Sequence, residues 1–166
     1  MISEKVLAID PGFERVGIAI IERTSGSQHN IVFSECFKTS PKLPFSERLL
    51  LIGKELDRVI KKYKPLSFAI EKLYFTTNQK TVMGVAEARG MMLYIAEKNK
   101  LSIFEYTPPQ IKVAVTGYGK ADKSMVIDMV YKLINVKKKT KSDDEIDAIA
   151  IGLTQLACEK PITHKK

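Results

Sequence analysis

Two short apolar segments of the sequence each end in an acidic side chain. Asp10 follows Lys5–Ile9 and precedes a Pro-Gly turn, and Glu71 closes the segment Phe68-Ala69-Ile70. In a strand's two-residue alternation, Asp10 points to the same side as Val6 and Ala8. One Asp beside a turn is an ordinary turn residue. Two acids at the carboxyl ends of apolar strands favour a ligand site, because that edge of an open α/β sheet is where ligands usually bind.

A third group of acids opens the last helical segment. Asp143, Asp144 and Glu145 suit the first turn of a helix, where negative charge is stabilised by the helix dipole. Asp147 lies beside an apolar stripe, so it is partly buried and needs a cation or hydrogen bonds as a partner. Spacing alone allows either Asp144 or Asp143 to share a surface with Asp147, since residues three or four apart are neighbours on a helix. The stripe consists of Ile146, Ile149, Ala150, Leu153 and Ala157.

These carboxylates together offer the hard oxygen ligands that Mg²⁺ and Mn²⁺ prefer. Two such ions about 4 Å apart can promote in-line hydrolysis of a phosphodiester, one activating water and the other stabilising the leaving oxygen. The pattern therefore predicts a metal-dependent nuclease site.

The charge balance points to a polyanionic partner. The 166 residues include 27 Lys and Arg against 19 Asp and Glu, a net charge of +8, which favours nucleic acid or an anionic membrane. No apolar run reaches membrane-spanning length, and the N-terminus lacks the apolar core of a signal peptide. We therefore expect a cytoplasmic protein. Cys36 and Cys158 form no metal-binding pair, and we expect both to be small buried apolar residues.

Turn residues and hydrophobic periodicity divide the chain into an α/β fold. Three strands joined by short turns predict an antiparallel meander, and two later strands alternate with helices. We expect one domain over residues 1–160, with a mixed five-stranded sheet flanked by helices, and a short basic tail at 161–166. The expected strands are Lys5–Ile9, Val16–Ile21, Ile31–Phe37, Ser67–Ile70 and Ser102–Tyr106, and the expected helices are Phe45–Tyr63, Gln79–Asn99, one opened by Pro108-Pro109, Lys123–Leu133 and Asp144–Ala157.

Several segments together resemble the RuvC-type Holliday junction resolvases, which are nucleases with an RNase H-like fold. The segments follow the order of that family and cover nearly the whole chain, and EARG and VTGYGKADK are its most particular motifs. They are VLAIDPGFERVGIAII (Val6–Ile21), FAIEKLYF (Phe68–Phe75), EARGMM (Glu87–Met92), FEYTPPQIKVAVTGYGKADKSMV (Phe104–Val126) and DEIDAIAIGL (Asp144–Leu153).

The resemblance implies a site and a reaction. The catalytic, metal-binding acids would be Asp10, Glu71, Asp144 and Asp147, with the family's D-x-x-D spacing selecting Asp144 over Asp143. They would hold two Mg²⁺ ions, for which Mn²⁺ substitutes. The enzyme would make paired symmetric nicks in four-way DNA junctions during recombination and repair, leaving 5′-phosphate and 3′-hydroxyl ends.

The resemblance also implies DNA contacts. Tyr74 matches an aromatic position near the junction centre, where a ring can stack on an unpaired base. Phe75 is the adjacent alternative, and a core aromatic is the competing interpretation of both. Lys112 and Lys123 match basic residues near the scissile phosphate, although solvated surface lysines are equally common. The weaker candidates for DNA contact are Lys80, Lys120 and Arg89.

The two-fold symmetry of a junction suits a homodimer, which the resemblance also implies. The helix Gln79–Asn99 is the candidate interface, with Met83, Met91 and Met92 either as adaptable contacts or as core fillers. A branch-migration complex of the RuvA/RuvB kind would be a further partner. His29 and His164 lie outside the matching segments and receive no catalytic role.

Three other interpretations fit parts of the pattern. A YqgF-type RNase H-like enzyme shares the acids but lacks the EARG and GKADK motifs. A non-catalytic DNA-structure-binding module would not need clustered acids, because bare carboxylates repel phosphate. An actin-like kinase fold also uses a strand-turn-strand with Asp and Gly, but it needs a longer, two-lobed chain.

Overall fold

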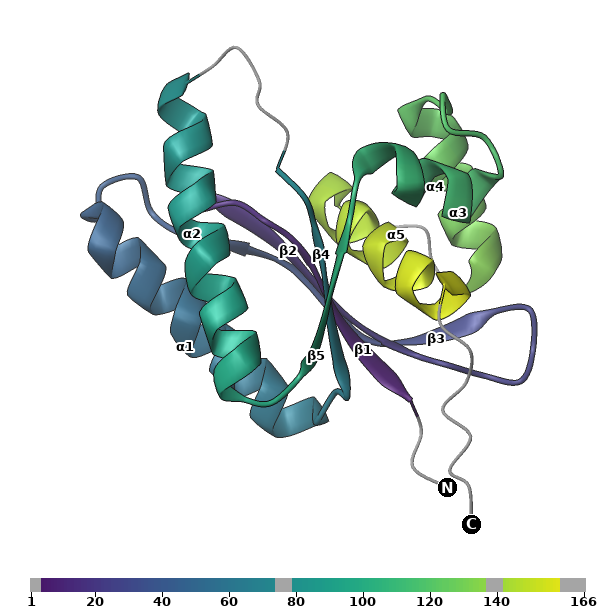
Figure 1. Cartoon of the computed structure of the whole chain (residues 1–166), viewed down its shortest axis with the longest axis horizontal. Helices are drawn as coiled ribbons and strands as arrows, with labels where there is room; N and C mark the ends of the chain where they lie inside the picture. The colour runs from purple at the N-terminus through teal and green to yellow at the C-terminus, as the bar shows by residue number, and fades with distance from the viewer. Residues whose placement is uncertain (1–3, 74–78, 137–141, 159–166) are drawn as a thin grey trace.

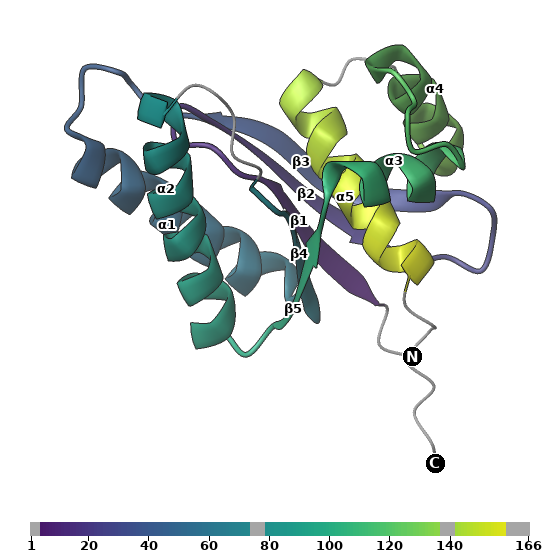
Figure 2. The same cartoon turned by 45° about the horizontal axis from the view of Figure 1, so that its top comes forward.

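A single mixed sheet with helices on both faces organises the protein (Figures 1 and 2). The structure is a computed structural model that describes residues 4–73, 79–136 and 142–158. The sheet has six strands in the order β5-β4-β1-β2-β3-β6. Helices α1 and α2 lie on one face, and α3, α4 and α5 lie on the other.

The N-terminal meander forms the middle of the sheet. Strands β1 (Lys5–Asp10), β2 (Arg15–Glu22) and β3 (His29–Lys38) pair antiparallel. Asp10 is the last residue of β1, and it lies opposite Gly17 of β2. The carboxyl end of β1 therefore meets the start of β2 at one edge of the sheet.

The two later strands extend the sheet in parallel with β1. Strand β4 (Ser67–Glu71) pairs with β1, and β5 (Ser102–Tyr106) pairs with β4. The connections are helices α1 (Phe45–Tyr63) and α2 (Gln79–Lys98), which cover the same face of the sheet. Since β1 and β4 run in parallel, their acidic ends meet at the same edge.

The opposite face carries the C-terminal third of the chain. It comprises α3 (Pro108–Thr116), α4 (Lys123–Leu133), the two-residue strand β6 (Ile134–Asn135) and α5 (Asp143–Cys158). Side-chain hydrogen bonds cap the starts of α3 and α4, with Thr107 accepting from the Gln110 amide and Asp122 from the Met125 amide. Helix α5 lies directly on β1 and β2: a side chain at Gly152 would run into Ile21 and come within 3.1 Å of Ala8 Cβ.

Strand alternation sends the buried side chains of the sheet into two core layers. Leu7, Ile9 and Phe68 pack toward α1 and α2. Val6, Ala8 and Ala69 pack toward α3, α4 and α5. By the same alternation, Asp10 and Glu71 belong to the α5 face, which is the side predicted for Asp10.

The predicted arrangement of three antiparallel and two parallel strands is confirmed, but the predicted number of strands is wrong. The sixth strand is β6, which pairs in parallel with the start of β3. Two residues are too short to produce a periodic pattern in the sequence.

The prediction for one cysteine is also wrong. Cys158 is exposed, because it is the last residue of α5 and lies beyond the part of the helix that the sheet covers. Cys36 is partly buried. Within the described ranges, no helix has the length and apolar character needed to cross a membrane. The tail 161–166 and His164 lie outside the described residues.

Candidate metal centre

The carboxyl ends of two neighbouring strands bring Asp10 and Glu71 together. The parallel register pairs Ile9 with Ile70, so the next residue on each strand is an acid. Both side chains face α5. The two acids predicted at strand ends therefore lie beside each other at one edge of the sheet.

The start of α5 brings the second pair of acids to the same edge. Gly17 makes the approach possible, because a Cβ at this position would lie only 2.8 Å from the Asp144 carbonyl carbon and 3.0 Å from Asp10 Cβ. The first turn of α5 thus packs against bare backbone of β2, beside Asp10. Asp147, one turn later, lies in the pocket that Glu71 also lines.

Burial and mutual repulsion make Asp10 hard to ionise. Burial, together with the charges of Asp147, Glu71 and Asp144, raises the pKa of Asp10 to about 8, and Lys123 opposes the rise. Burial and the charge of Asp147 also raise the pKa of Glu71, again against Lys123. If every acid were ionised, the cluster would therefore hold more negative charge than its own cations neutralise.

Asp144 is held by groups of the meander. Arg15 Nε donates to Asp144 Oδ2 at 2.9 Å, a second guanidinium nitrogen contacts the same oxygen, and the Cys36 thiol donates at 3.3 Å. Partial burial opposes ionisation, but these hydrogen bonds hold the pKa of Asp144 below its usual value. Burial and the neighbouring Asp144 charge raise the pKa of the Cys36 thiol.

The geometry distinguishes Asp144 from its neighbour. The Asp144 side chain is 20% exposed and turns toward β2 and β3, while the Asp143 side chain is 75% exposed and lies 3.9 Å from Lys123 Nζ. Asp144, and not Asp143, contributes to the raised pKa of Asp10. Asp144 is therefore the residue of the two that faces the cluster.

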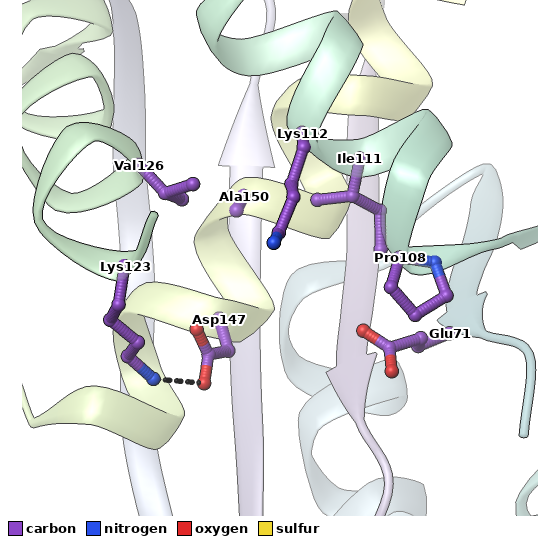
Figure 3. A pocket seen from close by; sticks show the side chains of 8 residues that line it. All are labelled: Glu71, Pro108, Ile111, Lys112, Lys123, Val126, Asp147 and Ala150. Atoms are coloured by element: carbon purple, nitrogen blue, oxygen red, sulfur yellow. Dashed lines mark hydrogen bonds and ion pairs between the residues drawn. The ribbon is translucent and has the colours of Figure 1, made fainter. Parts of the chain in front are cut away.

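Asp147 lies in a pocket with two lysines (Figure 3). Lys123 Nζ donates to Asp147 Oδ2 at 2.7 Å. Burial disfavours the charged Lys123, but the bond to Asp147 raises its pKa overall. Lys112 projects from α3 into the same space, and Glu71 stands on the far side. The pocket, of about 180 Å³, thus presents two cations and two carboxylates to a ligand.

The donor set suits a divalent cation, although its members do not converge as they stand. Across residues 4–73, 79–136 and 142–158, no three His, Cys, Asp or Glu side chains are arranged to hold one ion. Asp144 and Asp147 are instead bonded to Arg15 and Lys123. Burial and repulsion disfavour the charged forms of Asp10 and Glu71, in contrast, and a divalent cation would relieve both effects.

The remaining predicted DNA contacts differ in placement. Lys120 is exposed in the turn between α3 and α4. The Arg89 side chain is 14% exposed and is bonded within the protein, to the Glu71 carbonyl oxygen and to Glu105. Tyr74 and Phe75 lie outside the described residues, and so does the side chain of Lys80.

Helix α2 presents a different surface from the one that its methionines suggested. Met92 is fully buried in the core and Met91 packs against that core. Met83 is 68% exposed, and so is Tyr94, which the sequence analysis did not single out. Met92 is thus a core filler, and Met83 and Tyr94 are large apolar side chains that α2 exposes.

Three residues at the site were not predicted from the sequence. Arg15, Gly17 and Cys36 all contact Asp144, yet they lie on the meander, more than a hundred positions away along the chain. Only one of the three had a feature in the sequence that could have indicated its role. Gly17 interrupts a β-branched strand, which is typical of a close approach by another backbone.

A sheet of this order, with acids at two adjacent strand ends and on a helix packed across them, defines an RNase H-like fold with a carboxylate site. A family model described as crossover junction endodeoxyribonuclease RuvC matches residues 6–155. The chain therefore belongs to the RuvC family of crossover junction endodeoxyribonucleases.

Curated relatives share most of the chain. The RuvC of Caldicellulosiruptor saccharolyticus is 38% identical over 162 residues, which is 98% of this chain and 98% of the relative. The RuvC of Fusobacterium nucleatum is 41% identical, covering 92% of this chain and 80% of the relative. Both carry the name crossover junction endodeoxyribonuclease.

Solved structures agree with the fold. Thermus thermophilus RuvC in complex with a Holliday junction substrate superposes with a TM-score of 0.87 at 29% identity, covering 92% of this chain and 93% of that one. The yeast mitochondrial Holliday junction resolvase Ydc2 has a TM-score of 0.69 at 14% identity, covering 93% of this chain and 78% of the other, and supports the fold alone.

Proposed function

We propose that this protein resolves four-way DNA junctions by hydrolysing one phosphodiester in each of two symmetry-related strands. The observation that carries the proposal is the gathering of Asp10, Glu71, Asp144 and Asp147 at one sheet edge in a RuvC-family chain. Family membership implies a divalent metal. We further propose two Mg²⁺ ions, replaceable by Mn²⁺, with the four carboxylates as ligands.

Bound cations would supply two effects, activation of the attacking water and stabilisation of the leaving 3′-oxygen. The protein's own groups prepare for them. Asp10 and Glu71 are fixed by the sheet, while Asp144 and Asp147 would exchange their present partners, Arg15 and Lys123, for a bound divalent cation. Asp144 and Asp147 would then each have a cationic partner whether or not the metal is bound.

The lysine side chains of the pocket would have a separate role, which is to bind the phosphate. Lys123 and Lys112 border the same pocket as Glu71 and Asp147, at the place where a scissile phosphate would enter. Ammonium groups there would hold the phosphate and offset the charge that develops during displacement. The products would carry 5′-phosphate and 3′-hydroxyl ends.

The wider assignment follows from the substrate. The excess of basic residues would contact backbone phosphates. A homodimer through α2 would match the two-fold symmetry of a junction, with Met83 and Tyr94 as the exposed apolar contacts. We also propose that the enzyme acts in the bacterial cytoplasm, in recombination and repair, with a RuvA/RuvB-like branch-migration complex as its partner.

The test compares a synthetic four-way junction with a linear duplex of the same sequence, each with Mg²⁺ or with EDTA. We expect paired nicks in the junction alone and only with Mg²⁺. Asp10→Asn should abolish the nicks but retain junction binding in a gel-shift assay. Equal cutting of the duplex, or nicking that survives Asp10→Asn, contradicts the proposal.

A further inference from the structure

Arg89 forms a hydrogen bond to the strand that carries Glu71. It projects from the middle of α2, and its Nε donates to the backbone carbonyl oxygen of Glu71 at 3.0 Å. Another nitrogen of the same guanidinium forms an ion pair with Glu105 on β5. One side chain therefore ties a helix to the ends of two neighbouring strands.

The bond to Glu71 falls where the sheet no longer holds β4 on one side. The pairing of β1 with β4 ends at Ile9 and Ile70, one residue before Glu71. On the other side, the Lys72 amide donates to the Tyr106 carbonyl at 2.8 Å. Beside this bond to β5, Arg89 supplies a side-chain anchor for the Glu71 backbone at the point where the chain leaves the sheet.

Arg89 acts from the opposite face of the sheet to the Glu71 carboxylate. Ile70 and Ile103 pack toward α1 and α2, so by alternation Glu105 faces α2 as well. Glu71 faces α5 and the lysine pocket. Arg89 therefore fixes the position of the Glu71 carboxylate through the backbone without approaching the reacting atoms.

The burial of Arg89 argues against a contact with DNA. Its side chain is 14% exposed and that of Glu105 is 38% exposed. A guanidinium used for phosphate contacts presents its donors to solvent, whereas this one directs them to a carbonyl and a carboxylate of its own chain. Arginine suits the task because its planar fork can bond two acceptors in a fixed relation, which a lysine ammonium does not.

We propose that Arg89, anchored by Glu105, is a positioning residue that sets the Glu71 carboxylate for metal binding. The inference rests on the proposed function, in which Glu71 is a metal ligand. Groups that orient a ligand without touching the metal affect affinity or activity by about 10- to 100-fold. The EARG motif thus gains a physical role at the metal centre.

The experiment measures Mn²⁺ binding by calorimetry without DNA, junction cleavage with Mg²⁺, and junction binding in EDTA. Arg89→Lys should weaken Mn²⁺ binding and lower kcat by about tenfold or more, with junction affinity unchanged. Glu105→Gln retains the bond from Nε to Glu71, so its loss of Mn²⁺ affinity should be smaller than that of Arg89→Lys. Arg58→Lys is the matched control, since Arg58 forms a comparable pair with Glu55 on α1, and it should match the wild type.

Two results overturn the inference. One is a lower melting temperature of Arg89→Lys with unchanged Mn²⁺ affinity and kcat, which is the result expected if Arg89 is purely structural. The other is weaker junction binding in EDTA with normal Mn²⁺ affinity, as a DNA contact would give. If Arg89→Lys does not fold, Glu105→Gln decides, and wild-type Mn²⁺ affinity in that variant overturns the inference. Glu71→Gln is measured beside them: normal Mn²⁺ binding in that variant refutes the proposed metal site itself.

Discussion

Gly17 of β2 lies directly beneath the backbone of Asp144, the second residue of α5. A Cβ on Gly17 would lie 2.8 Å from the Asp144 carbonyl carbon and 3.0 Å from Asp10 Cβ. Backbone atoms cannot move aside to relieve such a clash as easily as the end of a flexible side chain can. The missing side chain therefore sets how closely the helical acids approach the strand acids.

Gly17→Ala should separate the two pairs of acids. The added methyl must push the first turn of α5 away from β2, and overpacking of this kind costs about 1–3 kcal/mol of stability. Because a misplacement of about 1 Å can cost 10²-fold in rate, we expect junction cleavage to fall by roughly that factor. Cleavage rate and thermal melting, measured together, check the prediction. Gly26→Ala is the control, since a Cβ there meets only Thr24 Oγ1 at 3.8 Å, and an equal loss in that variant would contradict the argument.

The two adjacent acids at the start of α5 should respond differently to neutralisation. Asp144→Asn should abolish cleavage while junction binding in EDTA persists, because Asp144 faces the cluster. Asp143→Asn should remain active within about twofold, since a weak exposed ion pair with Lys123 contributes little. Cleavage assays on the two variants provide the measurement. An inactive Asp143→Asn beside an active Asp144→Asn would move the ligand by one residue.

Lys123→Met should have opposite effects on metal binding and on catalysis. The variant frees Asp147 from its ion pair, so Mn²⁺ affinity measured without DNA should rise. Loss of the cation beside the phosphate should lower kcat by about 10²-fold. Lys132→Met, an exposed position on the same helix, is the control and should change neither quantity. A parallel fall in Mn²⁺ affinity and kcat would show that Lys123 serves the metal rather than the phosphate.

Glu35 on β3 should make stability depend on pH. Burial and the nearby Glu55 raise the pKa of Glu35 to about 7 from 4.5, and its Oε1 is buried without a hydrogen-bond partner. Because the folded state then binds more protons than the unfolded state, the free energy of unfolding falls as pH rises from 4.5 to 7. Glu35→Gln should therefore raise the melting temperature at pH 8 and leave it nearly unchanged at pH 4.5. Equal stabilisation at both pH values would exclude titration of Glu35 as the cause.

The sequence was sufficient to predict how the sheet is built and where two of its acids lie. Asp10 and Glu71 close apolar strands, and parallel strands must bring their carboxyl ends to one edge. Asp147 stood out because it lies beside an apolar stripe on a helix. These are local patterns, in which chain neighbours determine both the element and the exposed face.

Contacts made across the fold were not predictable from local patterns. Cys36 was expected to behave as an apolar residue, yet its thiol donates to Asp144. The bond from Arg89 to the backbone of Glu71 was not predicted either. In both cases the partner lies on a different element, and only the packing of α5 and α2 on the sheet brings the pair together. Strand β6 was missed for a related reason, because its two residues become a strand only by pairing with β3.

The order in which the acids occur along the chain bears on how the protein is made. Asp10 and Glu71 are synthesised early, but Asp144 and Asp147 belong to α5, the last helix in the described part of the chain. That helix also fills the core between the sheet and α3. A chain still growing on the ribosome therefore lacks two of the four proposed metal ligands until the helix that completes its core is made. A product truncated before α5 would therefore lack both part of its core and two of the four acids on which the proposed cleavage depends.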